Sequence, residues 1–225
     1  MTTLVLLPGM DGTGLLFGPL RAALPPGLTP RVVAYPSDVP LGYDGLDPVV
    51  EASLPADGPF LLLGESFSGP LALRAAARRP RGLAGVILVA TFAVAPYPAM
   101  FRHLVRPWMF RVGAKLRNRA LLGRDPDPAV AELLTGALAR VSPEVLARRV
   151  RAVLTVDETE ALRACPVPVL TLRGTKDRVV PRRCREHMSK LRPDLEAVAL
   201  DAPHLVLQTR PRESAGAIAV FLEAR

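Results

Sequence analysis

Ser66 lies in a short turn between an apolar run and a run with a helical pattern. Residues 60–63 are four apolar residues and predict a buried strand, and residues 70–79 predict a helix. A strand, a sharp turn and a helix form the nucleophile elbow, which exposes a serine hydroxyl above the sheet. Small residues must flank the serine because the helix returns close to the strand. Gly64 fits that need, whereas Ser68 stands where glycine is usual. The pattern predicts that Ser66 is a nucleophile.

Two later residues could supply the acid–base chemistry that a nucleophilic serine needs. Asp177 follows a predicted strand at 167–173, and His204 follows another at 195–200. The chain has two other histidines: His103 lies among arginines and His187 falls within a predicted helix. Only His204 therefore occupies a loop at the carboxyl end of a strand, where a general base is needed. A carboxylate at Asp177 could orient that histidine, although aspartate is also common in turns and as a helix N-cap.

A glycine-rich loop, Pro-Gly-Met-Asp-Gly-Thr-Gly at residues 8–14, follows the first predicted strand. Such loops often hold phosphate, but this one has neither the Gly-x-Gly-x-x-Gly nor the Gly-Lys-Ser/Thr pattern. An oxyanion loop fits better. In that interpretation the backbone N–H groups of Met10 and Phe67 bind the negative oxygen of a tetrahedral intermediate. A plain glycine turn is the alternative.

The elements that must position these residues alternate along the chain. Short apolar runs predict strands at 4–7, 31–35, 60–63, 85–90, 167–173 and 195–200. Helices are predicted between them at 17–24, 46–54, 70–79, 181–191 and 208–222. This alternation predicts an α/β fold with a doubly wound, mostly parallel sheet. The segment 95–156 contains no convincing strand, so we expect a core of residues 1–94 and 157–225 carrying a small helical cap at 95–156.

Composition narrows the class of protein. A chain of 225 residues with 49% hydrophobic residues fits one core domain with an insertion. The net charge of +8 is spread over the chain, and no nucleic-acid module is visible, so we expect no nucleic-acid partner. The amino terminus resembles neither a signal peptide nor a membrane span, which makes the cytoplasm the default location. Cys165 and Cys184 have no metal-binding spacing; we expect reduced thiols, with a disulfide left open.

The predicted cap carries two repeating patterns. Apolar residues recur every four positions and would line one helical face over the pocket: Trp108, Val112, Leu116 and Ala120. Basic residues recur beside them with the same spacing: Arg111, Lys115 and Arg119. The basic residues form either a solvated surface or a docking stripe for an acidic acyl carrier or the phosphates of coenzyme A.

Taken together, four motifs resemble the α/β-hydrolase superfamily over nearly the whole chain. They are Leu-Pro-Gly-Met-Asp-Gly-Thr-Gly at 7–14, Gly-Glu-Ser-Phe-Ser-Gly at 64–69, Gly-Thr-Lys-Asp-Arg-Val-Val-Pro at 174–181 and Pro-His at 203–204. The order serine, aspartate, histidine is that of the superfamily. The resemblance implies that the first strand of this chain corresponds to the third of the family, so we expect a version of the fold without the family's first two antiparallel strands.

The resemblance implies a Ser66–His204–Asp177 triad and acyl chemistry without a metal or an organic cofactor. We expect a serine carboxylesterase or thioesterase acting on a small ester or thioester. A resemblance to carrier-protein methyl ester esterases rests only on the basic charge of the cap. Two alternatives stay open: an acyltransferase that uses the same triad, and a low-turnover ligand receptor of the same fold.

Overall fold

Six strands form a single sheet in the computed structural model, which describes residues 1–112 and 114–224, without the side chains of 114 and 115. The strands are β1 (Thr2–Leu7), β2 (Leu28–Val32), β3 (Phe60–Glu65), β4 (Leu83–Val89), β5 (Val169–Gly174) and β6 (Glu196–Leu200). Their order across the sheet is β2-β1-β3-β4-β5-β6, and every neighbouring pair is parallel. The predicted α/β class and parallel sheet are confirmed.

The position of β2 differs from the prediction of 31–35. The strand begins at Leu28, which pairs with Thr2 of β1, and it includes Pro30. Proline lacks a backbone N–H, so it argues against a central strand, but it is tolerated at the edge of a sheet. Because β2 is the edge strand, only part of it is buried. The apolar pattern of the sequence was therefore weak at this strand.

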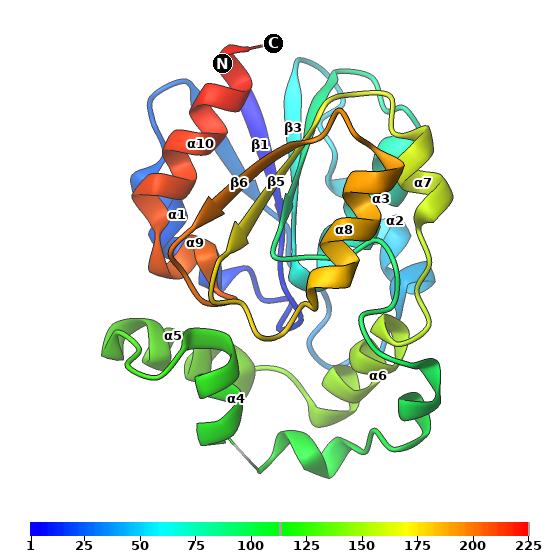
Figure 1. Cartoon of the computed structure of the whole chain (residues 1–225), viewed down its shortest axis with the longest axis vertical. Helices are drawn as coiled ribbons and strands as arrows, with labels where there is room; N and C mark the ends of the chain where they lie inside the picture. Colours follow the sequence, from blue (N-terminus) through cyan, green and yellow to red (C-terminus); the bar gives the residue numbers. More distant parts are fainter. Residues whose placement is uncertain (113, 225) are drawn as a thin grey trace.

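Helices cover both faces of the sheet (Figure 1). One face carries α1 (Gly18–Ala23), α9 (Val206–Thr209) and α10 (Pro211–Glu223), which pack on one another. The other carries α2 (Tyr43–Ser53), α3 (Gly69–Ala77), α7 (Thr159–Ala164) and α8 (Arg182–Leu191). Two separate apolar clusters, one on each face, fill the space between sheet and helices. This doubly wound arrangement explains why β3 is apolar along its whole length.

Residues 95–156, which lie between β4 and α7, form a helical layer at the carboxyl ends of the strands (Figure 1). Its helices are α4 (Ala114–Leu122), α5 (Pro128–Ala139) and α6 (Pro143–Val153), preceded by 3-10 helices Ala99–His103 and Pro107–Phe110. The chain enters and leaves it at one place, where Val94 pairs with Asp157 and the Ala95 N–H donates to the Val156 carbonyl at 2.8 Å. We call residues 95–156 the inserted segment; its limits as a separate domain stay a prediction.

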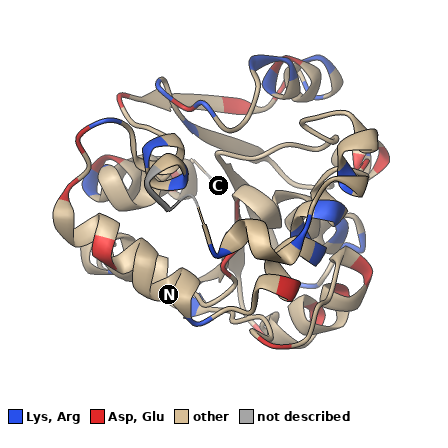
Figure 2. Cartoon of the chain, turned by 90° about the horizontal axis from the view of Figure 1, so that it is seen from below, with Lys and Arg blue, Asp and Glu red and all other residues tan. Residues whose placement is uncertain are grey.

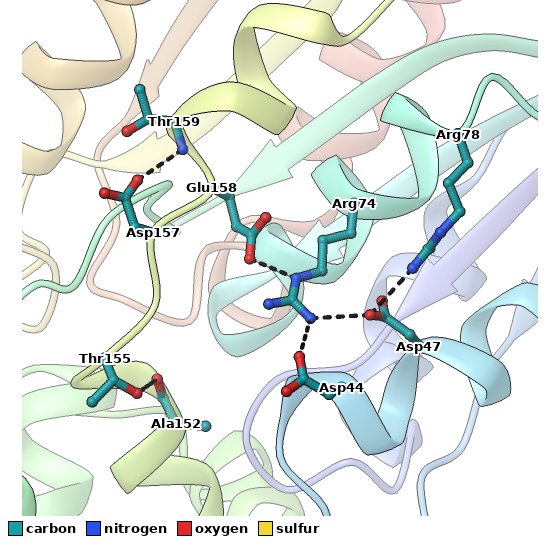
Figure 3. A network of polar contacts seen from close by, with 9 residues as sticks. All are labelled: Asp44, Asp47, Arg74, Arg78, Ala152, Thr155, Asp157, Glu158 and Thr159. Atoms are coloured by element: carbon teal, nitrogen blue, oxygen red, sulfur yellow. Dashed lines mark hydrogen bonds and ion pairs between the residues drawn. The ribbon is translucent and has the colours of Figure 1, made fainter.

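An ion-pair network holds the chain in place just after the inserted segment, where it re-enters the core (Figure 3). The Arg74 guanidinium of α3 contacts the carboxylates of Asp44 at 2.7 Å, Asp47 at 3.0 Å and Glu158 at 2.5 Å. Glu158 precedes α7, and its backbone N–H donates to the Ala93 carbonyl at 2.7 Å. The network thus joins α2, α3 and the start of α7 on the face of the sheet that these helices cover.

The structure corrects the predicted apolar face of the cap. Trp108 lies in the 3-10 helix Pro107–Phe110, Val112 follows that helix, and Leu116 lies in α4, so the three do not share one helix. Their side chains are 61%, 58% and 75% exposed, respectively. A four-residue period places residues on one face only within a continuous helix. The same break separates Arg111 from Arg119, both exposed, while the Lys115 side chain lies outside the described residues.

Charged residues are distributed over helices and loops around the molecule rather than gathered on one element (Figure 2). Cys165 and Cys184 are both buried and free, so the disulfide that the sequence left open does not form. Among the described residues, no helix is both long enough and apolar enough to cross a lipid bilayer.

Candidate active site

Ser66 follows β3 directly and opens the 3-10 helix Ser66–Ser68, after which α3 begins. Its backbone has φ of 49°, in the left-handed region that residues other than glycine rarely adopt. Gly64 is required on the strand side, because a Cβ there would lie 2.5 Å from the Ser68 carbonyl oxygen and 2.9 Å from Ala72 Cβ. The chain therefore forms the strained strand–turn–helix that the sequence predicted around Ser66.

Three side chains from distant parts of the sequence form a chain of hydrogen bonds. Ser66 Oγ lies 2.9 Å from His204 Nε2, and His204 Nδ1 lies 2.9 Å from Asp177 Oδ2. His204 is 2% exposed, and the Asp177 side chain is also buried. With Nδ1 donating to the carboxylate, Nε2 is left free to accept the serine proton. The structure thus brings together the three residues that the sequence proposed for catalysis.

Backbone hydrogen bonds hold the loops of Asp177 and His204 side by side. β5 and β6 are neighbours in the sheet, and the loop after β5 donates to the end of β6 and to the loop that follows it. Thr175 N–H donates to the Leu200 carbonyl at 2.8 Å, and Lys176 N–H donates to the Ala202 carbonyl at 3.0 Å. Parallel pairing brings both carboxyl ends to one edge of the sheet. This is why residues 27 positions apart can meet.

The Asp177 carboxylate is held in its charged form. Burial alone would raise its pKa, but the pKa is lowered overall by His204 and by the backbone N–H groups of Val179 and Val180. These N–H groups donate to Asp177 Oδ1 at 2.7 Å and 3.2 Å, leaving Oδ2 for the histidine. Asp177 is therefore ionised at neutral pH and fixed in orientation.

The glycine-rich loop after β1 emerges next to the elbow, because Leu7 of β1 pairs with Gly64 of β3. The Ser68 hydroxyl, which is fully buried, donates to the Pro8 carbonyl, and the Tyr35 hydroxyl lies 2.7 Å from Ser68 Oγ. Since Ser68 has one proton and gives it to Pro8, Tyr35 is the donor of the second bond. Serine in place of the usual glycine thus links the elbow to the first loop.

The two residues predicted to supply oxyanion N–H groups are Met10, on the glycine-rich loop, and Phe67, on the elbow, the two segments that the Ser68–Pro8 hydrogen bond joins. Met10 borders the cavity above Ser66. Phe67 is fully buried, and its ring stacks on Tyr43 with centroids 4.7 Å apart. The position of Phe67 directly after Ser66 fits the arrangement expected of an oxyanion hole. The structure places both residues beside Ser66, and their role stays a prediction.

A cavity of about 300 Å³ opens above Ser66 and His204. Both the core, with Met10 and Val179, and the inserted segment, with residues such as Leu134, line it. Most lining side chains are apolar: Leu16, Phe110, Ala120, Leu121, Leu134, Leu138, Leu146 and Leu205. Of the apolar stripe expected from the sequence, Ala120 borders the cavity, whereas Trp108, Val112 and Leu116 do not. The cavity therefore suits a small apolar group next to the serine hydroxyl.

Glu65 is a buried acid that the sequence analysis did not single out. It precedes Ser66, borders the cavity and is 2% exposed. Burial raises its pKa to about 7; Asp11 contributes in the same direction, while Gln208 and His204 oppose it. Gln208 Nε2 donates to its Oε1 at 2.9 Å, whereas Oε2 is buried with no partner among the described residues. Because Glu65 stands next to the serine in a short motif, the sequence carried no sign that its side chain is buried.

Arg149 of α6 is a second functional candidate that the sequence analysis missed. Its side chain is fully buried beneath the glycine-rich loop. A signal was available: Val145 and Ala152 lie one turn away on the buried face of α6, and Arg149 falls on that same face. An arginine on an apolar helical face is unusual enough to be noted. In a chain with many arginines this signal was easy to overlook.

Comparison with known proteins agrees with this geometry. The family model described as Alpha/beta hydrolase family matches residues 4–217, so the chain belongs to the alpha/beta hydrolase family. Polyketide synthase ThaQ of Burkholderia thailandensis is 28% identical over 97% of this chain, which spans 12% of the length of that protein.

Two solved structures share the fold. The hydrolase olei00960 from Oleispira antarctica has a TM-score of 0.84 at 14% identity, covering 100% of this chain and 92% of that one. The esterase EaEST from Exiguobacterium antarcticum has a TM-score of 0.79 at 14% identity, with 99% and 92% covered.

Proposed function

We propose that this protein is a serine hydrolase that cleaves small carboxylic esters or thioesters through an acyl-enzyme. Ser66 attacks the acyl carbon while His204 accepts its proton, and the protonated histidine then returns that proton to the leaving group. Asp177 keeps Nδ1 of the histidine protonated and stabilises the imidazolium. Water then attacks the acyl-enzyme in the same way and releases the acid.

The observation that carries this proposal is the hydrogen-bonded chain Ser66–His204–Asp177 at the floor of an apolar cavity. The nucleophile, the base and the orienting acid lie within hydrogen-bond distance of one another, and a serine that merely lies in a turn needs no such partners. Family membership supports hydrolase chemistry in general. The backbone N–H groups of Met10 and Phe67 complete the proposal as the site that binds the oxyanion.

The cavity supports an acyl chain of modest size as the group held above Ser66. Apolar side chains make up most of its lining, while Asp11, Glu65 and Arg117 are its charged members. The match to part of a protein named a polyketide synthase is one reason to test thioesters beside oxygen esters. We keep the acidic acyl carrier as a proposed partner, with exposed Arg111 and Arg119 as its proposed contacts and Lys115 as a third.

The experiment is a turnover series with p-nitrophenyl esters from about two to sixteen carbons and with matched thioesters of N-acetylcysteamine. We expect hydrolysis that is fastest for short or medium chains and that falls by about 10³-fold or more in Ser66→Ala. Adding an alcohol acceptor separates a hydrolase from an acyltransferase, because the latter gives the new ester as its main product. Binding of esters without turnover would favour a receptor and contradict the proposal.

A further inference from the structure

Arg149 reaches from α6 of the inserted segment to the backbone of the glycine-rich loop. Its Nη1 donates to the carbonyls of Met10 at 2.8 Å and Asp11 at 2.9 Å, and its Nη2 donates to the carbonyl of Pro36 at 2.8 Å. One side chain of the inserted segment thus holds the loop that contains Met10, and also the loop after β2. The core contributes only carbonyl oxygens to these bonds.

The environment of Arg149 is costly for a purely structural residue. The guanidinium is fully buried, and its Nη1 and Nη2 donate to neutral carbonyls rather than to a carboxylate. Burial lowers its pKa, opposed by the charge of Asp11. A buried charge without a bonded counter-ion costs several kcal/mol unless polar groups replace water. An apolar residue would fill the same space without a buried charge, but it would leave the carbonyls of Met10, Asp11 and Pro36 without this donor.

Arg149 also contacts the elbow. Its guanidinium carbon lies 6.0 Å from the centroid of the Phe67 ring and 5.6 Å from that of Tyr35. Tyr35 in turn hydrogen-bonds to Ser68 of the elbow. Arg149 therefore touches both segments whose N–H groups we assign to the oxyanion hole: Met10 through its carbonyl and Phe67 through its ring.

Gly12 gives Arg149 the room it needs. A Cβ on Gly12 would lie 2.5 Å from Arg149 Nη1, and the φ of Gly12 is +70°, which glycine adopts without strain. The loop is thus shaped around the guanidinium. Only arginine offers several donors in one rigid plane; lysine, with a single ammonium, would reach fewer of the three carbonyls.

We propose that Arg149 is a positioning residue that sets the geometry of the oxyanion hole and couples the inserted segment to it. The proposal rests on the proposed function. By fixing the Met10 carbonyl and packing on the Phe67 ring, Arg149 holds both N–H groups toward one point above Ser66. A movement of α6 would then change the transition-state stabilisation as well as the shape of the cavity.

The test compares Arg149→Lys and Arg149→Met with the matched variants Arg148→Lys and Arg148→Met. Arg148 is the neighbouring residue of α6 and is exposed, so its variants change the same helix by the same chemistry. The readouts are kcat per titrated active site, KM for a short neutral ester, and amide hydrogen exchange of residues 8–13. A trifluoromethyl ketone, whose adduct carries an oxyanion, reports on the hole directly.

We expect Arg149→Lys to lower kcat by about 10- to 100-fold with KM changed by less than about 3-fold, because a misplaced donor acts mainly on the transition state. The ketone should lose affinity by a similar factor, and exchange in residues 8–13 should become faster. The Arg148 variants should stay within about 2-fold in each readout. A purely structural role would lower the thermal midpoint but leave kcat per active site and ketone affinity unchanged.

Two results would overturn the proposal: an unchanged kcat per active site in Arg149→Lys, or unchanged exchange in residues 8–13. If Arg149→Met does not fold, the lysine variant decides. If the wild type cleaves no ester at all, the proposed function fails, but the exchange comparison still decides whether Arg149 holds the loop. Failure of the function and failure of the clamp are therefore separate outcomes.

Discussion

The buried carboxyl of Glu65 should make the stability of this protein depend on pH in a way that Glu65→Gln removes. Burial raises the pKa of Glu65 from its ordinary 4.5 to about 7, so the folded protein holds this proton more tightly than the unfolded chain does. Above pH 7 the folded state must bury a carboxylate, whereas below pH 4.5 it buries a neutral acid. Stability is therefore lost as the pH rises between these values.

The magnitude follows from the two pKa values. Each pH unit between them is worth about 1.4 kcal/mol, which gives roughly 3 kcal/mol in full, most of it lost between pH 5 and pH 8.5. Glutamine keeps the shape and the acceptor that faces Gln208 but does not ionise. The substitution should therefore gain roughly 2–3 kcal/mol relative to the wild type on going from pH 5 to pH 8.5.

The assay is urea unfolding of both proteins at the two pH values. Any constant effect of the substitution cancels, because only the change between the pH values is compared. For a chain of this size the expected gain corresponds to about 5–10 °C in the thermal midpoint. Glu51→Gln serves as the control, since Glu51 is exposed on α2 and should give no such change. A Glu65→Gln gain that is the same at both pH values would refute the reasoning.

Two further predictions concern the acid and the proposed partner. Asp177→Asn should lower kcat by about 10⁴-fold, because the histidine loses the carboxylate that fixes its tautomer. The control variants Asp157→Asn and Asp201→Asn should retain most activity. Steady-state kinetics of the three variants checks this prediction. Replacing Arg111, Lys115 and Arg119 together by glutamate should raise KM for a thioester on an acidic carrier but not for a short neutral ester. In the wild type, turnover of the carrier-bound substrate should fall steeply with salt, while turnover of the short neutral ester should be nearly unaffected. Equal salt dependence of the two substrates would show that these basic residues are an ordinary solvated surface and not a docking site.

Much of the core could be predicted because parallel strands buried on both faces leave continuous apolar runs. β3 and β4 are of this kind. Asp177 could be placed because it follows β5, which is also buried along most of its length, whereas His204 follows β6, a less buried strand at the edge of the sheet. Both positions then follow from one rule, since neighbouring parallel strands end at one edge of the sheet. The start of β2 was missed because Pro30 and the exposed residues of an edge strand hide its pattern.

The inserted segment was harder to predict than the core. A four-residue recurrence from Trp108 to Ala120 suggested one helical face, but the chain forms a 3-10 helix and then a separate α-helix there. The cavity wall instead comes from residues such as Leu134 and Leu146, which meet only through tertiary packing. The burial of Glu65 and Arg149 likewise depends on elements distant in sequence, which local patterns do not encode.

Covalent labelling of the serine tests the central claim most directly. The intact protein is treated with a fluorophosphonate, digested and analysed by mass spectrometry, with Ser66→Ala as the control. Ser66 is the nucleophile in this account, so we expect a single adduct on Ser66 and none in the control. Ser68 should stay unmodified, because its hydroxyl is buried and bonded to Pro8 and Tyr35. An adduct on Ser68, or no adduct at all, would contradict the account.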